Sequence, residues 1–410
     1  MPTLSESAAR LIQVPAQIPL DWQWEALTDL CRPKQWPTIK VSELDGGIFP
    51  VYGANGLIGN HSTFTHSIEI VAITCRGATC GTINLIPPRS YVTGNAMALD
   101  DVETSRICTP FLAYSLHYRG LADTIEGSAQ PQITRAGLSG VLLPLPPLPE
   151  QKKIAAILSS VDEAIQATQR VIDQTRRVKE GLLQDLLTRG LPGHHTRFKQ
   201  TEIGEIPESW EVRRLEELLS DGPRNGVYKP ASDIGEGTLI VGQTAFTTDR
   251  TVDCAAARRA RATDDDLIRY VLRRGDILIT RVYATQEGCG RPAMVTDLPE
   301  PAIYESNMMR IRVNEKQSTS GFLFHWLLHP VARRCLMSKS SSSNQTSINQ
   351  ETVGGLACPQ PPLHEQDSIV SILVACDQQV FDARRELAVL TATKAGLLQD
   401  LLTGKVRVTP

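Results

Sequence analysis

The sequence lacks the marks of membrane, secreted and zinc-binding proteins. No apolar run reaches about 18 residues, the length that a membrane-spanning helix needs. The first residues, MPTLSESAARLIQVPAQIP, have neither the basic start nor the apolar core of a signal peptide. The nine cysteines form no CxxC pair and are odd in number, which favours a reducing compartment over a disulfide framework. We therefore expect a cytoplasmic protein without membrane contact.

Motifs of common catalytic chemistry are also missing. The chain has no GxxxxGK[ST] phosphate loop, no HExxH pair, no GxSxG turn and no glycine-rich adenosylmethionine loop after a strand. We expect no catalytic residue, no metal ligand and no cofactor bound by this chain. Dispersed carboxylates leave a metal-dependent nuclease open, because such ligands need not form a local motif. A small-molecule enzyme is the weakest interpretation.

The chain also lacks a basic excess. Its net charge is -3 and its pI is about 6.3, whereas proteins that bind nucleic acid on their own are usually basic. Any DNA-binding surface must therefore be local or completed by a partner.

The dominant feature that is present is a long internal repeat. Residues 146–190 and 361–405 align without a gap at an offset of about 215, with about 19 of 45 positions identical. Each copy opens with prolines and an early acid, the signals of a helix start. About 38 residues at about 1.5 Å each predict a helix roughly 57 Å long. Since neither helix can bury its apolar stripe alone, we expect the two to pair antiparallel.

Apolar residues in each copy recur at alternating steps of four and three, the spacing of a coiled-coil seam. We call these positions the seam. They are Ile154, Leu158, Val161, Ile165, Thr168, Ile172, Thr175, Lys179, Leu182 and Leu186 in the first copy, and Ile369, Leu373, Cys376, Val380, Ala383, Leu387, Leu390, Lys394, Leu397 and Leu401 in the second.

Each copy carries a lysine on the seam and an aspartate in its first third. The midpoint between Asp162 and Lys179 falls near the middle of the first helix, so antiparallel pairing sets Lys179 opposite Asp377 and Lys394 opposite Asp162. Our hypothesis is that these crossed ion pairs fix the register of the two helices. The alternative, in which the lysines extend into solvent, stays open.

A second repeat precedes each helix, because an IPxxW motif begins at Ile18 and again at Ile206. The repeat unit is therefore a globular body followed by a helix. The predicted segments are an N-terminal tail (1–17), a first body (18–145), a helix (146–190), a linker (191–202), a second body (203–358), a helix (359–405) and a C-terminal tail (406–410). In the linker, His194 and His195 are interpreted as solvated residues rather than metal ligands.

Both bodies are expected to be mixed α/β. Short β-like runs occur at 48–52, 68–73, 82–86 and 238–241, a short helix is expected at 111–118, and glycine-rich turns separate the runs. Residues 127–133 match 342–348 at the helix offset, and their Ser, Gln and Asn side chains suit hydrogen bonds to phosphates or base edges. Arginines crowd between 250 and 291, where they could read bases, hold the DNA backbone or form a solvated face.

On these residues the chain resembles the DNA-specificity subunit of type I restriction-modification systems, over nearly its whole length. The most specific segments are PLPPLPEQKKIAAIL with GLLQDLLTRG, PPLHEQDSIVSIL with GLLQDLLTGK, and the two IPxxW motifs; YGANGLIG and RRGDILITR are looser. The resemblance implies an α+β protein with two target-recognition domains (18–145 and 203–358) in pseudo-twofold arrangement. Each domain would read one half of an asymmetric, bipartite DNA site, with two long antiparallel helices as a coiled-coil spacer.

The resemblance also implies partners. The chain itself would be non-catalytic and would bind double-stranded DNA together with two methyltransferase subunits, which use adenosylmethionine, and motor-nuclease subunits, which use ATP and magnesium. The helices and their flanks, including Glu150, Gln151, Glu365 and Gln366, would dock the methyltransferases. Residues in loops resembling the DNA-facing segments of the family are Tyr52, Asn55, Arg76, Gln130, Arg224, Asn225, Tyr228, Lys229, Arg281, Asn344 and Gln345.

Two alternatives stay open. The chain could be the specificity module of a fused methyltransferase-nuclease, which the neighbouring reading frames would reveal. It could instead be a coiled-coil scaffold with two protein-binding heads, in which case duplex DNA would bind no better than any polyanion.

Overall fold

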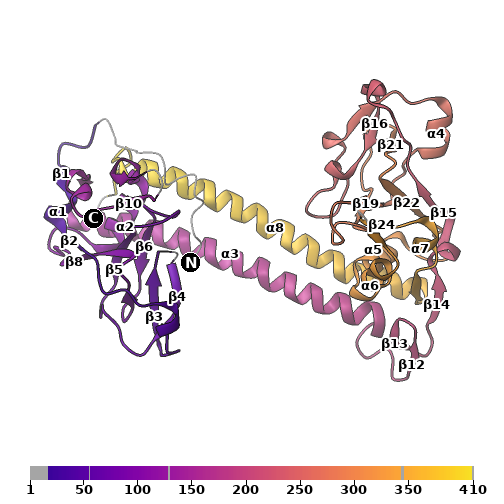
Figure 1. Ribbon diagram of the computed structural model, residues 1–410, viewed down its shortest axis with the longest axis horizontal. Coiled ribbons are helices and arrows are strands. Elements are labelled where there is room, and N and C mark those ends of the chain that lie inside the picture. Colours follow the sequence, from indigo (N-terminus) through magenta and orange to yellow (C-terminus); the bar gives the residue numbers. More distant parts are fainter. Residues whose placement is uncertain (1–16, 55, 128–129, 343–345, 409–410) are drawn as a thin grey trace. The chain divides into compact units, whose positions relative to one another are not determined.

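The computed structural model describes residues 17–54, 56–127, 130–342 and 346–408, which form two compact units (Figure 1). Unit 1 combines the chain up to Arg170 with residues from Ala383 onward, and unit 2 comprises Val171–Asp382. None of the helices in the described part of the chain combines the length and hydropathy that crossing a bilayer requires.

Unit 1 is built on two sheets. One is a four-stranded antiparallel sheet in the order β2-β8-β5-β6, and the other is three-stranded in the order β4-β3-β7, with β3 and β7 parallel. Their strands are β2 (Arg32–Lys34), β3 (Phe49–Gly53), β4 (Gly56–His61), β5 (Ile70–Thr74), β6 (Ile83–Ile86), β7 (Tyr91–Val92) and β8 (Ala96–Asp100). Strand β5 is central because its sequence, IVAIT, is β-branched or small throughout and buried on both faces.

Unit 2 repeats this plan. Its sheets have the orders β15-β22-β18-β20 and β17-β16-β21, with β16 and β21 parallel. Their strands are β15 (Leu219–Asn225), β16 (Ile234–Val241), β17 (Arg258–Ala260), β18 (Ile277–Thr280), β20 (Pro292–Met294), β21 (Ala302–Tyr304) and β22 (Met308–Val313). Taken in chain order, each strand has a counterpart in unit 1 with the same neighbours. The repeat therefore extends from the helices through both bodies.

Further elements surround these sheets, and some of them correspond. In each unit an antiparallel ribbon closes the body before the long helix: β1 with β11 in unit 1 and β14 with β25 in unit 2. The elements are β1 (Gln23–Ala26), α1 (Leu27–Leu30), α2 (Thr109–Arg119), β9 (Ile125–Glu126), β10 (Gln132–Ile133), β11 (Leu142–Leu145), β12 (Phe198–Thr201), β13 (Gly204–Pro207), β14 (Glu211–Arg214), α4 (Asp264–Tyr270), β19 (Val282–Tyr283), α5 (Ser320–Leu328), α6 (Pro330–Ser338), β23 (Ser341–Ser342), β24 (Thr346–Ser347), α7 (Gln350–Gly354) and β25 (Ala357–Gln360). The expected strands and the helix near 111–118 are confirmed.

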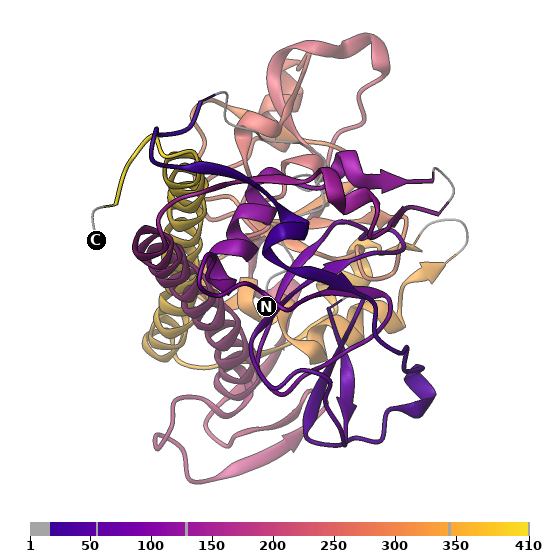
Figure 2. The ribbon, with the colours of Figure 1, turned by 90° about the vertical axis from the view of Figure 1, so that its left-hand side faces the viewer.

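The two predicted long helices are α3 (Leu148–Arg189) and α8 (Leu363–Leu402). In unit 1 the start of α3 lies beside the end of α8 (Figure 2). Ile154, Leu158, Leu398 and Leu401 of these two helices belong to one core. In unit 2 the end of α3 packs with the start of α8, so within each unit the helices run antiparallel. All twenty seam positions are buried or half-buried, as the spacing predicted.

The unit boundaries differ from the predicted ones. The sequence analysis treated the helices as a segment separate from the bodies, whereas each unit includes part of α3 and part of α8. The reason is packing: Ile154 and Leu158 belong to the core of the first body, and Leu186 and Leu187 belong to that of the second. Each body thus needs both helices to complete its core.

The crossed ion pairs expected on the seam are present. Lys179 Nζ lies 2.5 Å from Asp377 Oδ1 within unit 2, and Lys394 Nζ lies 2.5 Å from Asp162 Oδ1 within unit 1. The Lys394 side chain is 9% exposed, so it does not extend into solvent. A shift of one helix turn would separate both pairs, which is the physical basis for a role in register.

Charge reversal tests this role. We expect Lys179→Glu and Asp377→Lys each to lower the free energy of unfolding of unit 2 by about 1 kcal/mol, because each places like charges together. The double variant is expected to recover at least half of the summed loss, as measured by urea unfolding. Simply additive losses would show that the pair has no role in the register.

Two segments outside the predicted bodies, the linker and the C-terminal tail, are held by contacts. The linker contributes β12, which pairs with β13 of the second body. His195, expected to be solvated, is instead only 15% exposed and places Nε2 2.7 Å from Glu365 Oε1. The tail after α8 is also held, because Arg407 forms ion pairs with Asp21 and Glu150. In both segments the contact is to a glutamate that is buried at the start of a long helix, Glu365 for His195 and Glu150 for Arg407.

Candidate nucleic-acid interface

In unit 1, three loops that carry predicted DNA-facing residues meet at one place. Thr74 and Thr79 both donate from Oγ1 to Ala54 O, at 2.9 and 3.0 Å, which ties the loop after β5 to the loop after β3. Arg76 forms an isolated bridge with Gln132, so it lies beside the segment that contains Gln130. Arg76 and Gln130 are exposed.

Two other unit 1 predictions have different outcomes. Tyr52 is half-buried in β3 and packs against the apolar cluster around Val92, and burial raises the pKa of its phenol. Asn55 lies outside the described residues.

Unit 2 has the same loop geometry around Arg281. Arg281 directly follows β18, as Arg76 closely follows the equivalent strand β5. Ile348 N donates to Arg281 O at 3.0 Å, and Ile133 N donates to Cys75 O at 3.0 Å in unit 1. In both units the loop after the central strand therefore lies against the Ser/Gln/Asn-rich segment predicted from the repeat. Asn344 and Gln345 fall outside the described residues.

The other unit 2 candidates lie on and after β15. Arg224 and Asn225 end the strand and are half-buried, while Tyr228 is 77% exposed. Gly226 N donates to Met308 O at 3.0 Å, which holds this segment beside the turn that precedes β22. Arg281 Nη1 donates to Ser306 O of the same turn at 3.0 Å, so the two candidate segments flank one turn.

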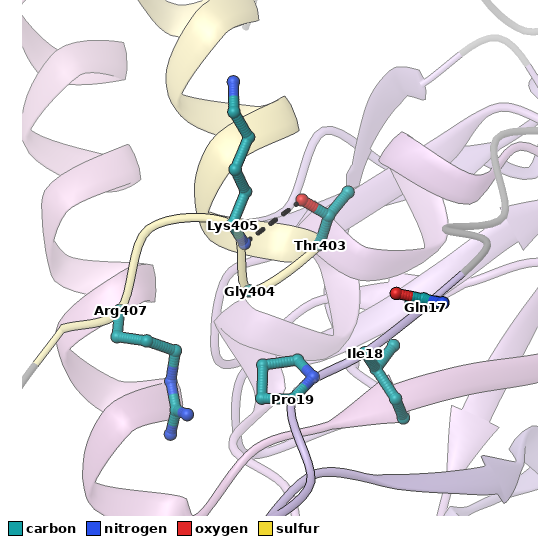
Figure 3. Close-up of a pocket in the computed structure, with 7 residues that line it drawn as sticks. All are labelled: Gln17, Ile18, Pro19, Thr403, Gly404, Lys405 and Arg407. Atoms are coloured by element: carbon teal, nitrogen blue, oxygen red, sulfur yellow. Dashed lines mark hydrogen bonds between the residues drawn. The ribbon is translucent and has the colours of Figure 1, made fainter.

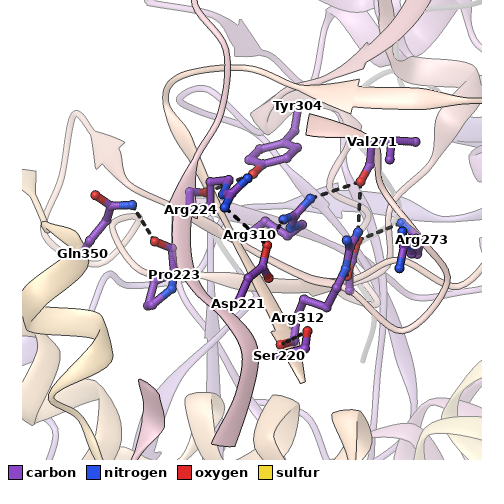
Figure 4. A network of polar contacts seen from close by, with 11 residues as sticks. Ser220, Asp221, Pro223, Arg224, Val271, Arg273, Tyr304, Arg310, Arg312 and Gln350 are labelled. Carbon is purple, nitrogen blue, oxygen red and sulfur yellow. Dashed lines mark hydrogen bonds and ion pairs between the residues drawn. The ribbon is translucent and has the colours of Figure 1, made fainter. Parts of the chain in front are cut away.

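A polar network holds the backbone under these residues (Figure 4). Arg310 Nη2 lies 2.6 Å from Asp221 Oδ2, and Arg312 lies 2.7 Å from Asp276. Arg310 is 2% exposed and Asp276 is 2% exposed, so these charges are compensated inside the protein. Tyr304 donates from its hydroxyl to Arg224 O at 3.1 Å. The network fixes the course of β15, and with it the position of Arg224.

Lys229, predicted to face DNA, is paired within unit 2. Its Nζ lies 2.6 Å from Asp266 Oδ2, and its side chain is only 9% exposed. Asp266 also accepts hydrogen bonds from Thr263 at the start of α4, and these contacts lower its pKa against the opposing effect of burial. Lys229 therefore ties its loop to the start of α4.

The four residues predicted to dock partner subunits are buried instead. Glu150, Gln151, Glu365 and Gln366 are between 0% and 4% exposed. Gln151 donates from Nε2 to Pro146 O at 2.8 Å, and Gln366 donates to Pro361 O at 2.9 Å, so each glutamine fixes the turn that leads into its helix.

The glutamates are equally engaged. Trp22 donates from Nε1 to Glu150 at 3.3 Å, and Trp210 donates to Glu365 at 3.0 Å. In each unit the tryptophan of the IPxxW motif thus contacts the glutamate at the start of the long helix. The sequence analysis had described the motif and the helix as two separate repeats. Both glutamates are thus engaged within their own unit.

Unit 1 has a pocket of about 420 Å³ between the segment before β1 and the end of α8 (Figure 3). It is lined by Gln17, Ile18, Pro19, Thr403, Gly404, Lys405 and Arg407. The two cations in its wall are already paired, Lys405 with Asp400 and Arg407 with Asp21 and Glu150. It offers neither a nucleophile beside a base nor a pair of carboxylates. Among the described residues, no three His, Cys, Asp or Glu side chains converge as a metal site would require.

A family model described as the type I restriction modification DNA specificity domain matches residues 19–175 and 207–388. The chain belongs to this specificity family. It is 26% identical to the type I restriction enzyme MjaVIII specificity subunit of Methanocaldococcus jannaschii over 96% of this chain and 94% of that protein. It is 28% identical to the EcoBI specificity subunit of Escherichia coli over 57% of this chain and 51% of that protein.

The fold of this specificity-family chain also has solved counterparts. The type I restriction-modification S subunit of M. genitalium matches with a TM-score of 0.64 at 15% identity, over 95% of this chain and 98% of that one. A chain from a structure on complex assembly and conformational transition of the type I R-M system matches with a TM-score of 0.54 at 19% identity, over 96% of this chain and 100% of that one.

One group of residues escaped the sequence analysis of this family member. Arginine crowding between 250 and 291 was visible, but which arginines converge was not. Arg250 and Arg291 lie close to Arg333, which belongs to α6 and follows more than 40 residues later. No sequence signal links α6 to this group, because the contact depends on how α6 packs beside the loop after β18.

Proposed function

We propose that the chain is the non-catalytic DNA-recognition subunit of a type I restriction-modification complex and binds a bipartite, asymmetric DNA site, one half per body. The observation that carries this proposal is the repeated fold with unlike loops. Equivalent strands present Arg76 in unit 1 and Arg281 in unit 2, yet the segments around them differ in sequence and length. Two bodies with one architecture and different side chains suit two different half-sites.

The long helices would act as a coiled-coil spacer that relates the two bodies by a pseudo-twofold axis. Recognition of two half-sites about one DNA turn apart, roughly 34 Å, requires elements held rigidly at a fixed distance. The antiparallel packing and the ion pair within each unit support this role, because they oppose sliding of one helix along the other.

Methyltransferase subunits would dock on the helices, but through residues other than the buried glutamates and glutamines. Within unit 2 the outer faces of α3 and α8 expose Val171, Val178, Val374 and Phe381, each between 43% and 51% exposed. The members of each pair are seven residues apart, so they lie on one face of their helix. These partners would bind adenosylmethionine and methylate adenine, while motor-nuclease subunits would use ATP and Mg²⁺. Partner subunits that share the duplex would also account for the modest net charge of this chain.

A genome-wide adenine-methylation map tests the proposal. Cells that carry the chain with the neighbouring methyltransferase are expected to show a gapped, two-part motif that disappears when this chain alone is deleted. Methylation that is unchanged, or a continuous motif independent of the chain, would contradict the proposal and favour the two-headed scaffold.

Exchanging part of one body with that of a relative shows which half of the DNA motif each body recognises. Replacing residues 32–133 by the matching segment of a relative spares the β1–β11 ribbon and the Trp22 contact. It is expected to change one half of the motif and leave the other half unchanged. The matched control exchanges residues 219–348 of unit 2 and should change the opposite half.

A further inference from the structure

Three arginines of unit 2, Arg250, Arg291 and Arg333, are gathered by their backbone and side-chain contacts. Arg333 donates from Nη1 to Cys289 O at 2.8 Å and from Nη2 to Glu287 O at 3.0 Å, so its guanidinium lies against the segment that leads to Arg291. Met294, three residues after Arg291, donates from its backbone N to Arg250 O at 2.9 Å. The three side chains therefore come from three chain segments that meet beside β20.

The positive charges in this group act on one another. Burial lowers the pKa of Arg250, and the nearby charges of Arg291 and Arg333 lower it further, with a partial offset from Asp377. Burial also lowers the pKa of Arg333, and Arg291 adds to that effect. Asp377 is itself engaged by Lys179 at 2.5 Å. The group is thus a set of like charges that repel at close range.

Carboxylates do not neutralise this group. Elsewhere in unit 2, arginines commonly have a carboxylate within 4.0 Å, as Arg258 has Glu305 and Arg259 has Glu300. Within the described parts of the chain, none of the three arginines forms an ion pair. Arg250 also adopts φ 61°, a left-handed conformation that is uncommon for a residue with a side chain. Such conformations cluster at ligand-binding positions.

We propose that Arg250, Arg291 and Arg333 bind a phosphodiester group of the DNA backbone and so strengthen the hold of unit 2 on DNA without reading its sequence. This inference rests on the proposed function. A guanidinium presents a planar fork of donors that matches phosphate oxygens, and a bound phosphate would relieve the repulsion among the three charges.

The position of the group fits a phosphate contact beside the candidate interface. A Cβ built on Gly290 would lie 2.9 Å from Arg333 Nη1 and 3.5 Å from Ile348 Cδ1. Ile348 N in turn donates to Arg281 O. The arginine group therefore borders the loop that carries Arg281, where base contacts are proposed, which is the usual relation between residues that position DNA and residues that read it.

The test measures DNA binding by the full chain as a function of salt. Fluorescence anisotropy would follow two duplexes, one with the motif from the methylation map and one with that motif scrambled, between 50 and 200 mM salt. The variants are Arg291→Gln, whose parent side chain is exposed, and the double variant Arg250→Gln/Arg291→Gln. The matched control is Arg197→Gln, which removes one charge from an arginine side chain that is 83% exposed and paired with Glu208.

Loss of one phosphate contact is expected to reduce the slope of log K against log salt by about 0.9, and affinity should fall by about tenfold on both duplexes alike. Arg291→Lys, which keeps the charge, should retain most of the slope, and Arg197→Gln should match the wild type.

Three outcomes would overturn the inference. If the slope of log K against log salt is unchanged in the double variant while the wild type still prefers the motif duplex, the proposed phosphate contact is contradicted and the proposed function is not. A loss confined to the motif duplex would identify base reading instead. Absence of duplex binding by the wild-type chain, alone and with its methyltransferase, would remove both proposals.

Discussion

Replacing Trp210 by alanine is expected to lower the free energy of unfolding of unit 2 by about 3–5 kcal/mol. The indole is fully buried in the unit 2 core, together with Leu187 from α3 and Ile369 from α8. Its Nε1 also donates to Glu365 at 3.0 Å. The substitution therefore leaves a cavity and removes one partner of a buried carboxylate, two costs that act in the same direction.

Two further variants separate these costs. Trp210→Phe keeps most of the volume and loses the hydrogen bond, so we expect a loss of about 1–3 kcal/mol. Trp22→Ala makes the equivalent change in unit 1, where Trp22 is 4% exposed and donates to Glu150. Hydrogen-deuterium exchange along the chain should locate the loss in unit 2 for Trp210 and in unit 1 for Trp22. A loss spread equally over both units in each variant would contradict this account.

Acidification is expected to destabilise unit 2 through two buried histidines of its second half. Burial, with a further contribution from Lys179, lowers the pKa of His325 to about 3, and burial lowers that of His329 to about 4. In the unfolded chain both imidazoles have a pKa near 6.5. Above about pH 6.5 both states are neutral and stability is complete. As the pH falls below that value, the two histidines bind protons in the unfolded chain but stay neutral in the folded one. The free energy of unfolding therefore falls until the pH reaches the pKa of each histidine in the folded state.

The slope of this loss is large enough to measure. Each histidine contributes about 1.4 kcal/mol per pH unit, so the pair contributes up to about 2.7 kcal/mol per unit between roughly pH 6 and pH 4. The double variant His325→Leu/His329→Asn removes both titrating groups and should flatten the dependence. Leucine suits the site of His325, whose Nδ1 is buried without a hydrogen-bond partner among the described residues, and asparagine can keep the cap that His329 provides to Val331.

His364→Gln is the matched control, because His364 is exposed at the start of α8. It should leave the pH dependence of unfolding, measured by urea titration at each pH, the same as in the wild type. A wild-type stability that stays level from pH 6.5 to pH 4 would show that these histidines are protonated in the folded state.

The long helices could be predicted from sequence because their repeat is ungapped and their seam spacing is regular. The same reasoning gave the pairing of Lys179 with Asp377, since position along two antiparallel rods follows from counting residues. The strand order that the two bodies share was not predicted. Its strands are short and separated by loops of different length, so the shared order of β5 and β18 within their sheets emerges only from hydrogen-bond pairing.

The candidate site was harder to predict because a sequence shows charges but not their partners. Lys229 and Glu365 were both assigned to contacts outside the chain, yet each is bound to a residue more than 30 positions away, Asp266 and Trp210. The grouping of Arg250 with Arg333 was missed because the sequence does not show that these two residues lie near each other. Nor does it show that neither has a carboxylate partner among the described residues.

The docking of Arg407 onto Asp21 and Glu150 has a consequence for the order of folding during synthesis. Unit 2 is one continuous segment, Val171–Asp382, inserted between the two parts of unit 1. Leu398 and Leu401 complete the unit 1 core, so the body translated first is the one that waits longest for its last contacts. A ribosome that stops short of these residues would release a chain with a finished second body and an open first one. Completion of the unit 1 core thus depends on whether the chain has been made through α8.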